Sequence, residues 1–429
     1  MEMRKITLGD CIIDCASGPF GSNLKVECFV EDGFPIIDGA NLKGVRVTDN
    51  ITKFVTEEKA RSLSRSIAKR RDVIVTISGT LGQISFIPND SKYNEYLCSQ
   101  RQFRVTFDES KIDVEYLVNY LHTDFGQKKI LSFANYVGVP ALAQPLPNFK
   151  KIELLIPSIQ NQKKVVQVLS ALDDKIALNK KMNQKLEAMA KRLYDYWFVQ
   201  YDFPDKNGHP YKTTGGPMTY NPTLKREIPA GWEEKTLKEC IKHINTGLNP
   251  RDNFVLGNGD IKYVTVKNLT MEGNIDFSGC DFIDEDALKK VHKRSDIAKG
   301  DVLYASICPL GRSYLINKDP VGWDINESVF SIRPNLDVIS SEFLSVFLKD
   351  SAVVEKASKM ATGSIFKGIR IKELENMILA VPVKDVMEKF SKQIKNLIEL
   401  EHKNTEQIAH LTALRDKLLP LLMNGQVVV

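Results

Sequence analysis

Two long stretches of the chain repeat apolar residues with the alternating three- and four-residue spacing of a helix face. The first runs from Pro157 to Phe198 and the second from Val383 to Met423. Each has one narrow apolar seam, and a single seam implies a single partner helix. We therefore expect two long helices that pair with each other.

Each seam contains a polar residue at the same relative position. Both stretches begin just after an apolar-Pro pair, as expected when Pro occupies the first turn of a helix, and superposing Pro157 on Pro382 places Asn179 on Asn404. An Asn in a seam costs stability but fixes register, because a slipped pairing leaves its amide unsatisfied. We predict that these asparagines set the helix register. The alternative is that two unrelated surface helices happen to be amphipathic.

The regions before the two helices have short strand-like runs separated by Gly, Pro and Asn, which indicates an α+β fold. They run from Arg4 to Pro157 and from Trp232 to Pro382, and one longer helix is expected over 114–131. The second region follows the first in order, as in Asp72-Val73 with Asp301-Val302 and Phe103 with Phe330. Matched positions are mainly apolar, Gly or Pro, so the sequence predicts a duplicated scaffold with two different surfaces.

A segment rich in Pro, Gly, Asn and Thr separates the two halves and is typical of a linker laid on the surface in turns. The expected organisation is a globular unit over 1–156, a helical spacer over 157–200, the linker over 201–231, a second globular unit over 232–381 and a second helical spacer over 382–429.

Length and composition fit a multidomain protein with more than one core: 429 residues, of which 43% are hydrophobic and 26% charged. No apolar run approaches the roughly 18 to 20 residues of a membrane span, and the start has no apolar signal region, so we expect a cytoplasmic protein. Seven scattered cysteines without CxxC pairs indicate neither a disulfide framework nor a zinc site. The net charge of +5 is compatible with a polyanionic partner.

Motifs for catalysis are missing from the sequence. It has no GxxxxGK[ST] phosphate loop, and Asn221-Pro222-Thr223 departs from the Asn-Pro-Pro-aromatic segment of amino-methyltransferases, so no cofactor is expected. The six histidines have no spacing that suggests a metal. Pro204-Asp205 with Glu233-Glu234-Lys235 could form a loose metal-dependent nuclease pattern, which remains an alternative.

Basic segments recur at one place in both halves, around Arg65-Ser66 and Arg294-Ser295. Such runs are usually solvated faces, but their recurrence favours contacts to a nucleic-acid backbone. The turns SGTLGQ and CPLGRS share a Leu-Gly pair whose glycines, Gly82 and Gly311, should have positive φ, with polar neighbours as possible base readers. The candidate DNA-binding residues are Lys43, Arg46, Arg61, Arg65, Thr80, Gln83, Lys267, Asn268, Lys290, Lys293, Arg294 and Arg312.

The order of these features resembles the DNA specificity subunit of type I restriction-modification systems over essentially the whole chain. The resemblance rests on the segments RDVIVTISGTLG and KGDVLYASICPLG, the two Pro-initiated helices, the YDFPDKNGHPYKTTGG linker and the terminal LRDKLLPLLMNGQV. Cys308-Pro309 departs from the usual small-residue and Gly turn. The resemblance implies two target recognition domains joined by two long antiparallel helices in a coiled coil, related by an internal pseudo-twofold repeat.

It also implies that the chain is not an enzyme. Each recognition domain would read one half of a split double-stranded DNA target, with half-sites roughly 34 to 36 Å apart. Two methyltransferase subunits would carry methylation, and restriction/translocase subunits would join through them. The alternatives from other classes are the nuclease above and an adaptor that binds only protein.

Overall fold

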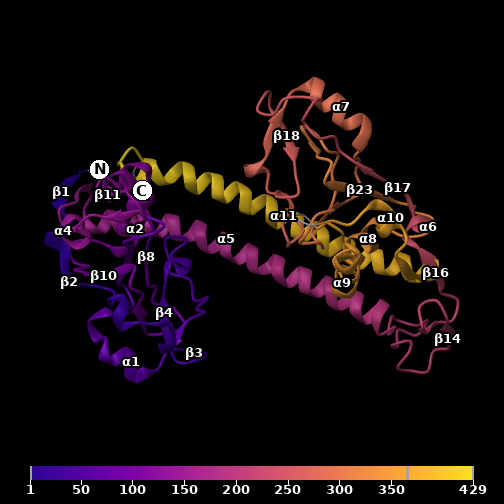
Figure 1. Ribbon diagram of the computed structural model, residues 1–429, viewed down its shortest axis with the longest axis horizontal. Helices are drawn as coiled ribbons and strands as arrows, with labels where there is room; N and C mark the ends of the chain where they lie inside the picture. Colours follow the sequence, from indigo (N-terminus) through magenta and orange to yellow (C-terminus); the bar gives the residue numbers. More distant parts are fainter. Residues whose placement is uncertain (1, 364–366, 428–429) are drawn as a thin grey trace. The chain divides into compact units, whose positions relative to one another are not determined.

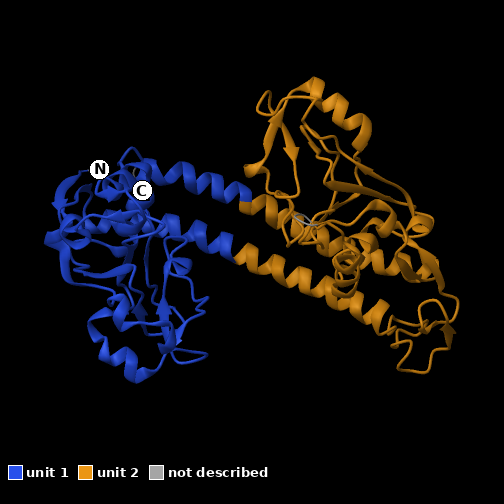
Figure 2. Cartoon of the chain, in the orientation of Figure 1, with its two compact units in different colours: residues 1–177, 409–429 blue, residues 178–408 orange. Residues whose placement is uncertain are grey.

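The computed structural model describes residues 2–363 and 367–427 (Figure 1). The chain forms two compact units, shown in different colours in Figure 2. Unit 1 consists of residues 1–177 and 409–429, and unit 2 consists of residues 178–408. Both long helices therefore contribute to both units.

Unit 1 is built on an antiparallel four-stranded sheet with the order β2 (Ile12–Ser17), β10 (Gln102–Phe107), β7 (Val73–Thr76) and β8 (Ile84–Phe86). A second sheet has the order β3 (Phe29–Val30), β5 (Phe54–Val55), β4 (Phe34–Ile37), β9 (Glu95–Cys98) and β6 (Ile67–Lys69), with β4 parallel to β9. The smaller pairs are β1 (Arg4–Thr7) with β13 (Glu153–Ile156), and β11 (Ala134–Asn135) with β12 (Ala141–Leu142). The short helices are α1 (Glu57–Ser62), α2 (Val114–His122), α3 (Asp124–Leu131) and α4 (Pro145–Lys150).

Unit 2 repeats the four-stranded sheet and the strand pair at the domain ends, and its second sheet has three strands instead of five. Its four-stranded sheet has the order β17 (Ile241–Thr246), β23 (Val329–Pro334), β20 (Val302–Ala305) and β21 (Ser313–Leu315). β18 (Ile261–Val264) lies between β19 (Asp281–Ile283) and the parallel β22 (Trp323–Ile325), and β16 (Glu233–Thr236) pairs with β24 (Ile378–Val381). The short helices are α6 (Leu237–Cys240), α7 (Glu285–Ser295), α8 (Ser341–Phe347), α9 (Ser351–Met360) and α10 (Ile371–Glu375).

Strand register confirms the predicted repeat. Phe103 of β10 lies opposite Val75 of β7, and Phe330 of β23 lies opposite Tyr304 of β20. The predicted α+β class and internal duplication are therefore correct, and residues of the two units can be matched strand by strand. The glycines of the two Leu-Gly turns have positive φ as expected, 84° at Gly82 and 92° at Gly311.

The core of unit 1 is formed by side chains from both of its segments, residues 1–177 and 409–429. Buried side chains of the four-stranded sheet, such as Val75 and Phe103, belong to one cluster with Leu169 of the first long helix and with Leu422 and Met423 near the end of the chain. Burial of one such aliphatic side chain contributes about 1.5–3 kcal/mol. The last turns of the chain are thus part of this core.

The two predicted long helices are confirmed as α5 (Ile159–Tyr194), followed by a π-helical turn over Asp195–Val199, and α11 (Lys384–Met423). Within unit 2 they pair antiparallel, since Asn179 Nδ2 donates to Gln407 Oε1 at 3.1 Å and Asn404 Nδ2 donates to Asn183 Oδ1 at 2.9 Å. Among the described residues no helix combines the length and apolar character needed to cross a membrane.

Both seam asparagines are buried, with 1% of Asn179 and 8% of Asn404 exposed. They do not bond to each other, because each finds an amide partner on the opposite helix. Their role in setting the register remains a prediction.

The single helix expected over 114–131 is instead two helices, α2 and α3. Thr123 separates them: its backbone is extended, its Oγ1 donates to the carbonyl of Tyr120 at 2.6 Å, and it accepts from the N–H of Gly126 at 3.2 Å. Thr123 is therefore the N-cap of α3, a function that Thr performs well because its hydroxyl satisfies an otherwise unpaired N–H.

The segment over 201–231 is folded by aromatic contacts. Phe203 stacks on Tyr211 with ring centroids 4.6 Å apart and on Trp232 at 5.4 Å. Asp202 accepts from the backbone N–H of Thr213 at 2.7 Å. The hairpin of β14 (Met218–Asn221) and β15 (Arg226–Pro229) follows.

Candidate nucleic-acid interface

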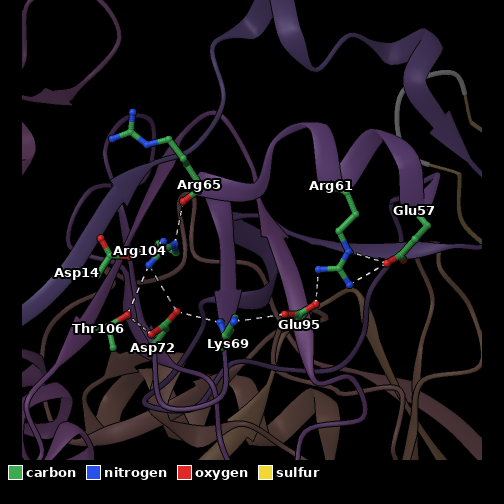
Figure 3. A network of polar contacts seen from close by, with 9 residues as sticks. All are labelled: Asp14, Glu57, Arg61, Arg65, Lys69, Asp72, Glu95, Arg104 and Thr106. Carbon is green, nitrogen blue, oxygen red and sulfur yellow. Dashed lines mark hydrogen bonds and ion pairs between the residues drawn. The ribbon is translucent and has the colours of Figure 1, made fainter.

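Arg65 is an exposed cation on a fixed piece of backbone. It lies in the 3-10 turn Ser64–Ser66 after α1, and Figure 3 shows its guanidinium directed away from the neighbouring polar side chains. Within the described part of the chain this guanidinium has no hydrogen bond or ion pair. Its carbonyl oxygen, in contrast, accepts from Arg104 Nε at 3.0 Å.

Arg104 is the centre of the network beneath Arg65 (Figure 3). Its Nη2 donates to Asp14 at 2.7 Å, and its Nη1 lies 4.0 Å from Asp72. The hydrogen bond from Arg104 lowers the pKa of Asp14. Burial raises the pKa of Asp72, which also accepts from Thr106 Oγ1 at 2.6 Å and from the backbone N–H of Lys69 at 2.9 Å. A charge pair satisfied by this many hydrogen bonds holds the Arg65 turn in one position.

Unit 2 has a similar network of a strand arginine, a hydroxyl and a buried aspartate, but the arginine and the hydroxyl have changed places along the strand. Arg333 donates from Nε to Asp301 Oδ1 at 2.8 Å, and Ser331 Oγ donates to Asp301 Oδ2 at 3.1 Å. Arg104 and Thr106 of β10 thus correspond to Ser331 and Arg333 of β23, with the arginine and the hydroxyl in opposite order.

The arginine of unit 2 again holds a basic segment by its backbone. Nη2 of Arg333 donates to the carbonyl oxygen of Asp296, two residues after Arg294 at the end of α7. Arg294 and Lys293 are exposed, like Arg65. In both units, therefore, a strand arginine holds the backbone of the segment with the exposed cation, with Arg104 buried and Arg333 half-buried.

Two of the predicted DNA-binding arginines are engaged in ion pairs within unit 1. Arg61 lies 2.8 Å from Glu57 and 2.7 Å from Glu95, as Figure 3 shows. Arg46 lies 3.2 Å from Glu115 and 3.0 Å from Asp174. Their charge is balanced by the fold, so the prediction that they contact DNA receives no support from the geometry.

Gln83 and Arg312 were expected to be possible base readers, and the structure shows that both side chains connect loops. Gln83 Nε2 donates to the carbonyl of Gly39 at 3.0 Å, and Arg312 Nη1 donates to the carbonyl of Val266 at 2.6 Å. Arg312 also donates to the carbonyls of Pro309 and Ile307. Since these donors are used within the fold, the geometry gives no support to base reading by the two residues, and their contact with DNA stays a prediction.

The geometry gives no support to a DNA contact by Asn268 either, and this contact also stays a prediction. Asn268 is 3% exposed, its Oδ1 accepts from the N–H of Thr265 at 2.8 Å, and its Nδ2 donates to the carbonyl of Asp276 at 3.1 Å. Asn41 has the matching role in unit 1, where its Oδ1 accepts from the N–H of Asp38 at 3.1 Å.

The remaining predicted residues have exposed side chains. Lys290 donates to the carbonyl of Asn253 at 3.0 Å and keeps its charge at the surface. The exposed candidates are Lys43, Arg65 and Thr80 in unit 1 and Lys267, Lys290, Lys293 and Arg294 in unit 2.

Sequence reasoning missed a hollow in unit 1, which has a volume of about 750 Å³. Thr80 and Gln83 line it together with Gln100 and Arg101, from the turn between β9 and β10. A comparison of the two halves could have drawn attention to this turn, because Phe103 and Phe330 match whereas the residues before them differ.

The acids of the nuclease alternative have separate structural roles. Asp205 Oδ1 accepts from the N–H groups of Asn207 at 2.7 Å and His209 at 2.9 Å, and the latter bond is the main cause of its lowered pKa. Glu233 lies 2.6 Å from Lys235. Within the described residues no group of three or more His, Cys, Asp or Glu side chains could hold a metal ion.

Fold and surface together define a class of protein: a duplicated α+β protein with exposed cations at equivalent places in its halves. The chain belongs to the family of the type I restriction modification DNA specificity domain, whose model matches residues 28–188 and 229–410.

Relatives and a solved structure agree with the family. The specificity subunit of the type I restriction enzyme MjaIX from Methanocaldococcus jannaschii is 27% identical over 385 residues, which cover 87% of this chain and 81% of the relative. The HindI specificity subunit of Haemophilus influenzae is 22% identical over 331 residues, 64% of this chain and 69% of the relative. The crystal structure of an S subunit from M. genitalium has the same fold, with a TM-score of 0.60, 15% identity and coverage of 98% of this chain and 96% of that one.

Proposed function

We propose that this chain is the DNA specificity subunit of a type I restriction-modification system and reads a bipartite target with one half-site for each recognition domain. The observation that carries the proposal is the duplication: the family model matches once in each half, and in both halves a strand arginine holds the backbone of an exposed basic segment. Two different surfaces on one scaffold are suited to two different half-sites.

The proposal assigns recognition to residues 1–156 and 232–381, spacing to the helices over 157–200 and 382–429, and a connection to residues 201–231. Supporting this division, β1 pairs with β13 and β16 pairs with β24, so that each recognition domain begins and ends on one two-stranded sheet. Such paired ends close each domain where it joins the following long helix.

Partners supply the chemistry in this proposal. The relatives are named as specificity subunits of restriction enzymes, which are non-catalytic, and methylation then requires a methyltransferase. We infer two methyltransferase subunits, one for each half of the duplication, with restriction/translocase subunits joining through them. Chromosomal DNA as the target implies the cytoplasm as the site of action.

Mapping methylated bases in cells tests the proposal. Cells expressing the chain with the methyltransferase subunits of its system should gain methylation at one split sequence, and omitting the chain should abolish it. Methylation that is unchanged without the chain would contradict a specificity function. Metal-dependent nicking of DNA by the purified chain, lost in Asp205→Ala, would instead support the nuclease alternative.

A further inference from the structure

The hollow of unit 1 is formed by loops at one end of its two larger sheets. Its lining residues come from four segments: Leu24, Val26 and Phe29; Ile36, Asp38, Gly39, Ala40 and Lys53; Thr76, Ser78, Gly79, Thr80 and Gln83; and Ser99, Gln100, Arg101 and Gln102. The rim includes exposed polar side chains, Thr80, Gln100 and Arg101, above apolar ones such as Leu24. A concave site that combines polar side chains with some apolar ones is suited to binding an edge or a planar group.

The backbone of Arg101 is fixed from several directions. Its carbonyl oxygen accepts from the N–H of Ile77 at 2.7 Å, and its own N–H donates to Ser99 Oγ at 3.4 Å. Ser99 in turn donates from its N–H to the carbonyl of Ile37 at 2.9 Å. Gly18 is packed so closely against this turn that a Cβ there would lie 1.9 Å from the Ser99 oxygen. The turn therefore has little freedom to move.

The side chain of Arg101 is free to bind a ligand. The part of the chain that the structure describes gives its guanidinium no hydrogen bond or ion pair, and the side chain is exposed. Lys53, the other cation of the hollow, is paired with Asp38 at 2.7 Å. The guanidinium also lies over a glycine, since a Cβ on Gly79 would stand 3.7 Å from Nη1 of Arg101. A guanidinium that has no partner and stands on a rigid turn is preorganised to donate two hydrogen bonds to a ligand.

We propose that Arg101 reads a guanine of the half-site bound by unit 1, with the amide of Gln100 available to a neighbouring adenine. This inference rests on the proposed function. Guanine presents two acceptors, O6 and N7, on its major-groove edge, and the guanidinium fork matches both, whereas an amide matches adenine. The apolar side chains in the lining, such as Val26 and Phe29, suit contact with the flat parts of the same bases.

Unit 2 has the same turn without the reader. Ser328 is the equivalent of Arg101, because both stand two residues before the matched Phe103 and Phe330. The N–H of Ser306 donates to the carbonyl of Ser328 at 3.0 Å, as Ile77 does to Arg101. The backbone is thus held alike while the side chain differs, which is the property expected of a position that determines specificity.

The test compares Arg101→Ala and Arg101→Lys with the wild-type chain, each in complex with the methyltransferase subunits. Binding is measured on duplexes in which every base pair of the first half-site is replaced in turn. For Arg101→Ala, the preference for G·C at one position should fall by roughly 5- to 150-fold, the equivalent of 1–3 kcal/mol for one bidentate pair. Arg101→Lys keeps the charge but not the fork and should lose most of the same preference.

Arg65→Ala is the matched control, because its charge is removed from the same unit outside the hollow. It should weaken all duplexes alike and leave every base preference unchanged. Retained selectivity for the second half-site shows that each variant is folded. Unchanged preferences throughout the first half-site in Arg101→Ala would overturn the assignment while leaving the proposed function intact, whereas a wild-type complex without bipartite preference would overturn both.

Discussion

Arg61 and Arg65 are one helical turn apart in the sequence and have opposite surroundings. Two carboxylates neutralise Arg61, whereas Arg65 presents a free charge on a turn held by Arg104. A basic residue contributes to binding a polyanion only where its charge is not already balanced. The contrast gives a matched pair of variants.

Arg65→Ala and Arg294→Ala should weaken binding of the complex to all DNA sequences to the same extent. Each lost phosphate contact is expected to reduce the slope of log affinity against log salt by about 0.9. Arg61→Ala removes a charge of the same type from the same segment and should leave the slope unchanged. Binding titrations at several salt concentrations measure this, and equal slopes for all variants would place Arg65 and Arg294 away from the DNA.

At the scale of elements, local patterns in the sequence specified the helices and the repeat. The seams and the apolar-Pro starts predict α5 and α11, because a helix can bury one face only if its apolar residues recur with the helical period. The matched apolar positions of the two halves predict equivalent strands. The candidate site was less predictable. Asn268 and Gln83 have residue types common in DNA contacts, but their side chains bond to backbone groups of the fold: Asn268 to Asp276 in its own loop, and Gln83 to Gly39, 44 residues away. Arg101 has no local signal, because its surroundings come from several loops.

Substitutions of the paired asparagines between α5 and α11 of unit 2 should have non-additive effects on stability. Asn404→Leu alone leaves the half-buried Asn183 Oδ1 without its donor and should cost about 1–3 kcal/mol of stability. Replacing Asn183 and Asn404 together with Leu removes both groups and should recover most of that loss. Thermal unfolding of the two variants measures the coupling. A double variant less stable than the single one would show that Asn183 contributes mainly through its bond to Thr405.

Glu401 of α11 should make unit 2 less stable as pH rises. Burial, with a smaller contribution from Glu187 and opposed by Lys349, raises its pKa from 4.5 to about 7. Between these values the unfolded chain loses the proton while the folded chain keeps it, so the folded state is penalised increasingly up to about pH 7 and constantly above it. Glu401→Gln should therefore gain stability over wild type across this window, by at most about 3 kcal/mol.

The neighbouring His402 provides the opposite control. Burial lowers its pKa from 6.5 to about 4, so its contribution to stability is complete above 6.5 and is lost as pH falls toward 4. The stability that His402→Gln gains over wild type should therefore grow as pH falls, whereas the gain of Glu401→Gln should grow as pH rises. Unfolding measured from pH 4 to 8 checks both, and a pH-independent gain in Glu401→Gln would show that its carboxyl is ionised throughout.

At the scale of the whole molecule, the two recognition domains should be exchangeable. Replacing Arg4 to Leu155 by the matching region of a relative should change one half-site and leave the other, because unit 2 has its own core. A changed set of base contacts, each worth about 1–3 kcal/mol, shifts the preference by orders of magnitude. A methylation map of the chimera tests this. Changes in both half-sites would mean that the halves form one composite surface.

The packing of Leu422 and Met423 into the core of unit 1 also has a consequence for synthesis on the ribosome. Residues 1–177 emerge first, but the segment that completes their core is made only after residues 178–408. At about 5–20 residues per second, this delay is on the order of ten to fifty seconds. During that time Leu169 lacks its partners on the last helix. A nonsense mutation just upstream of the codon for Leu422 should therefore damage unit 1, although residues 1–177 are made intact.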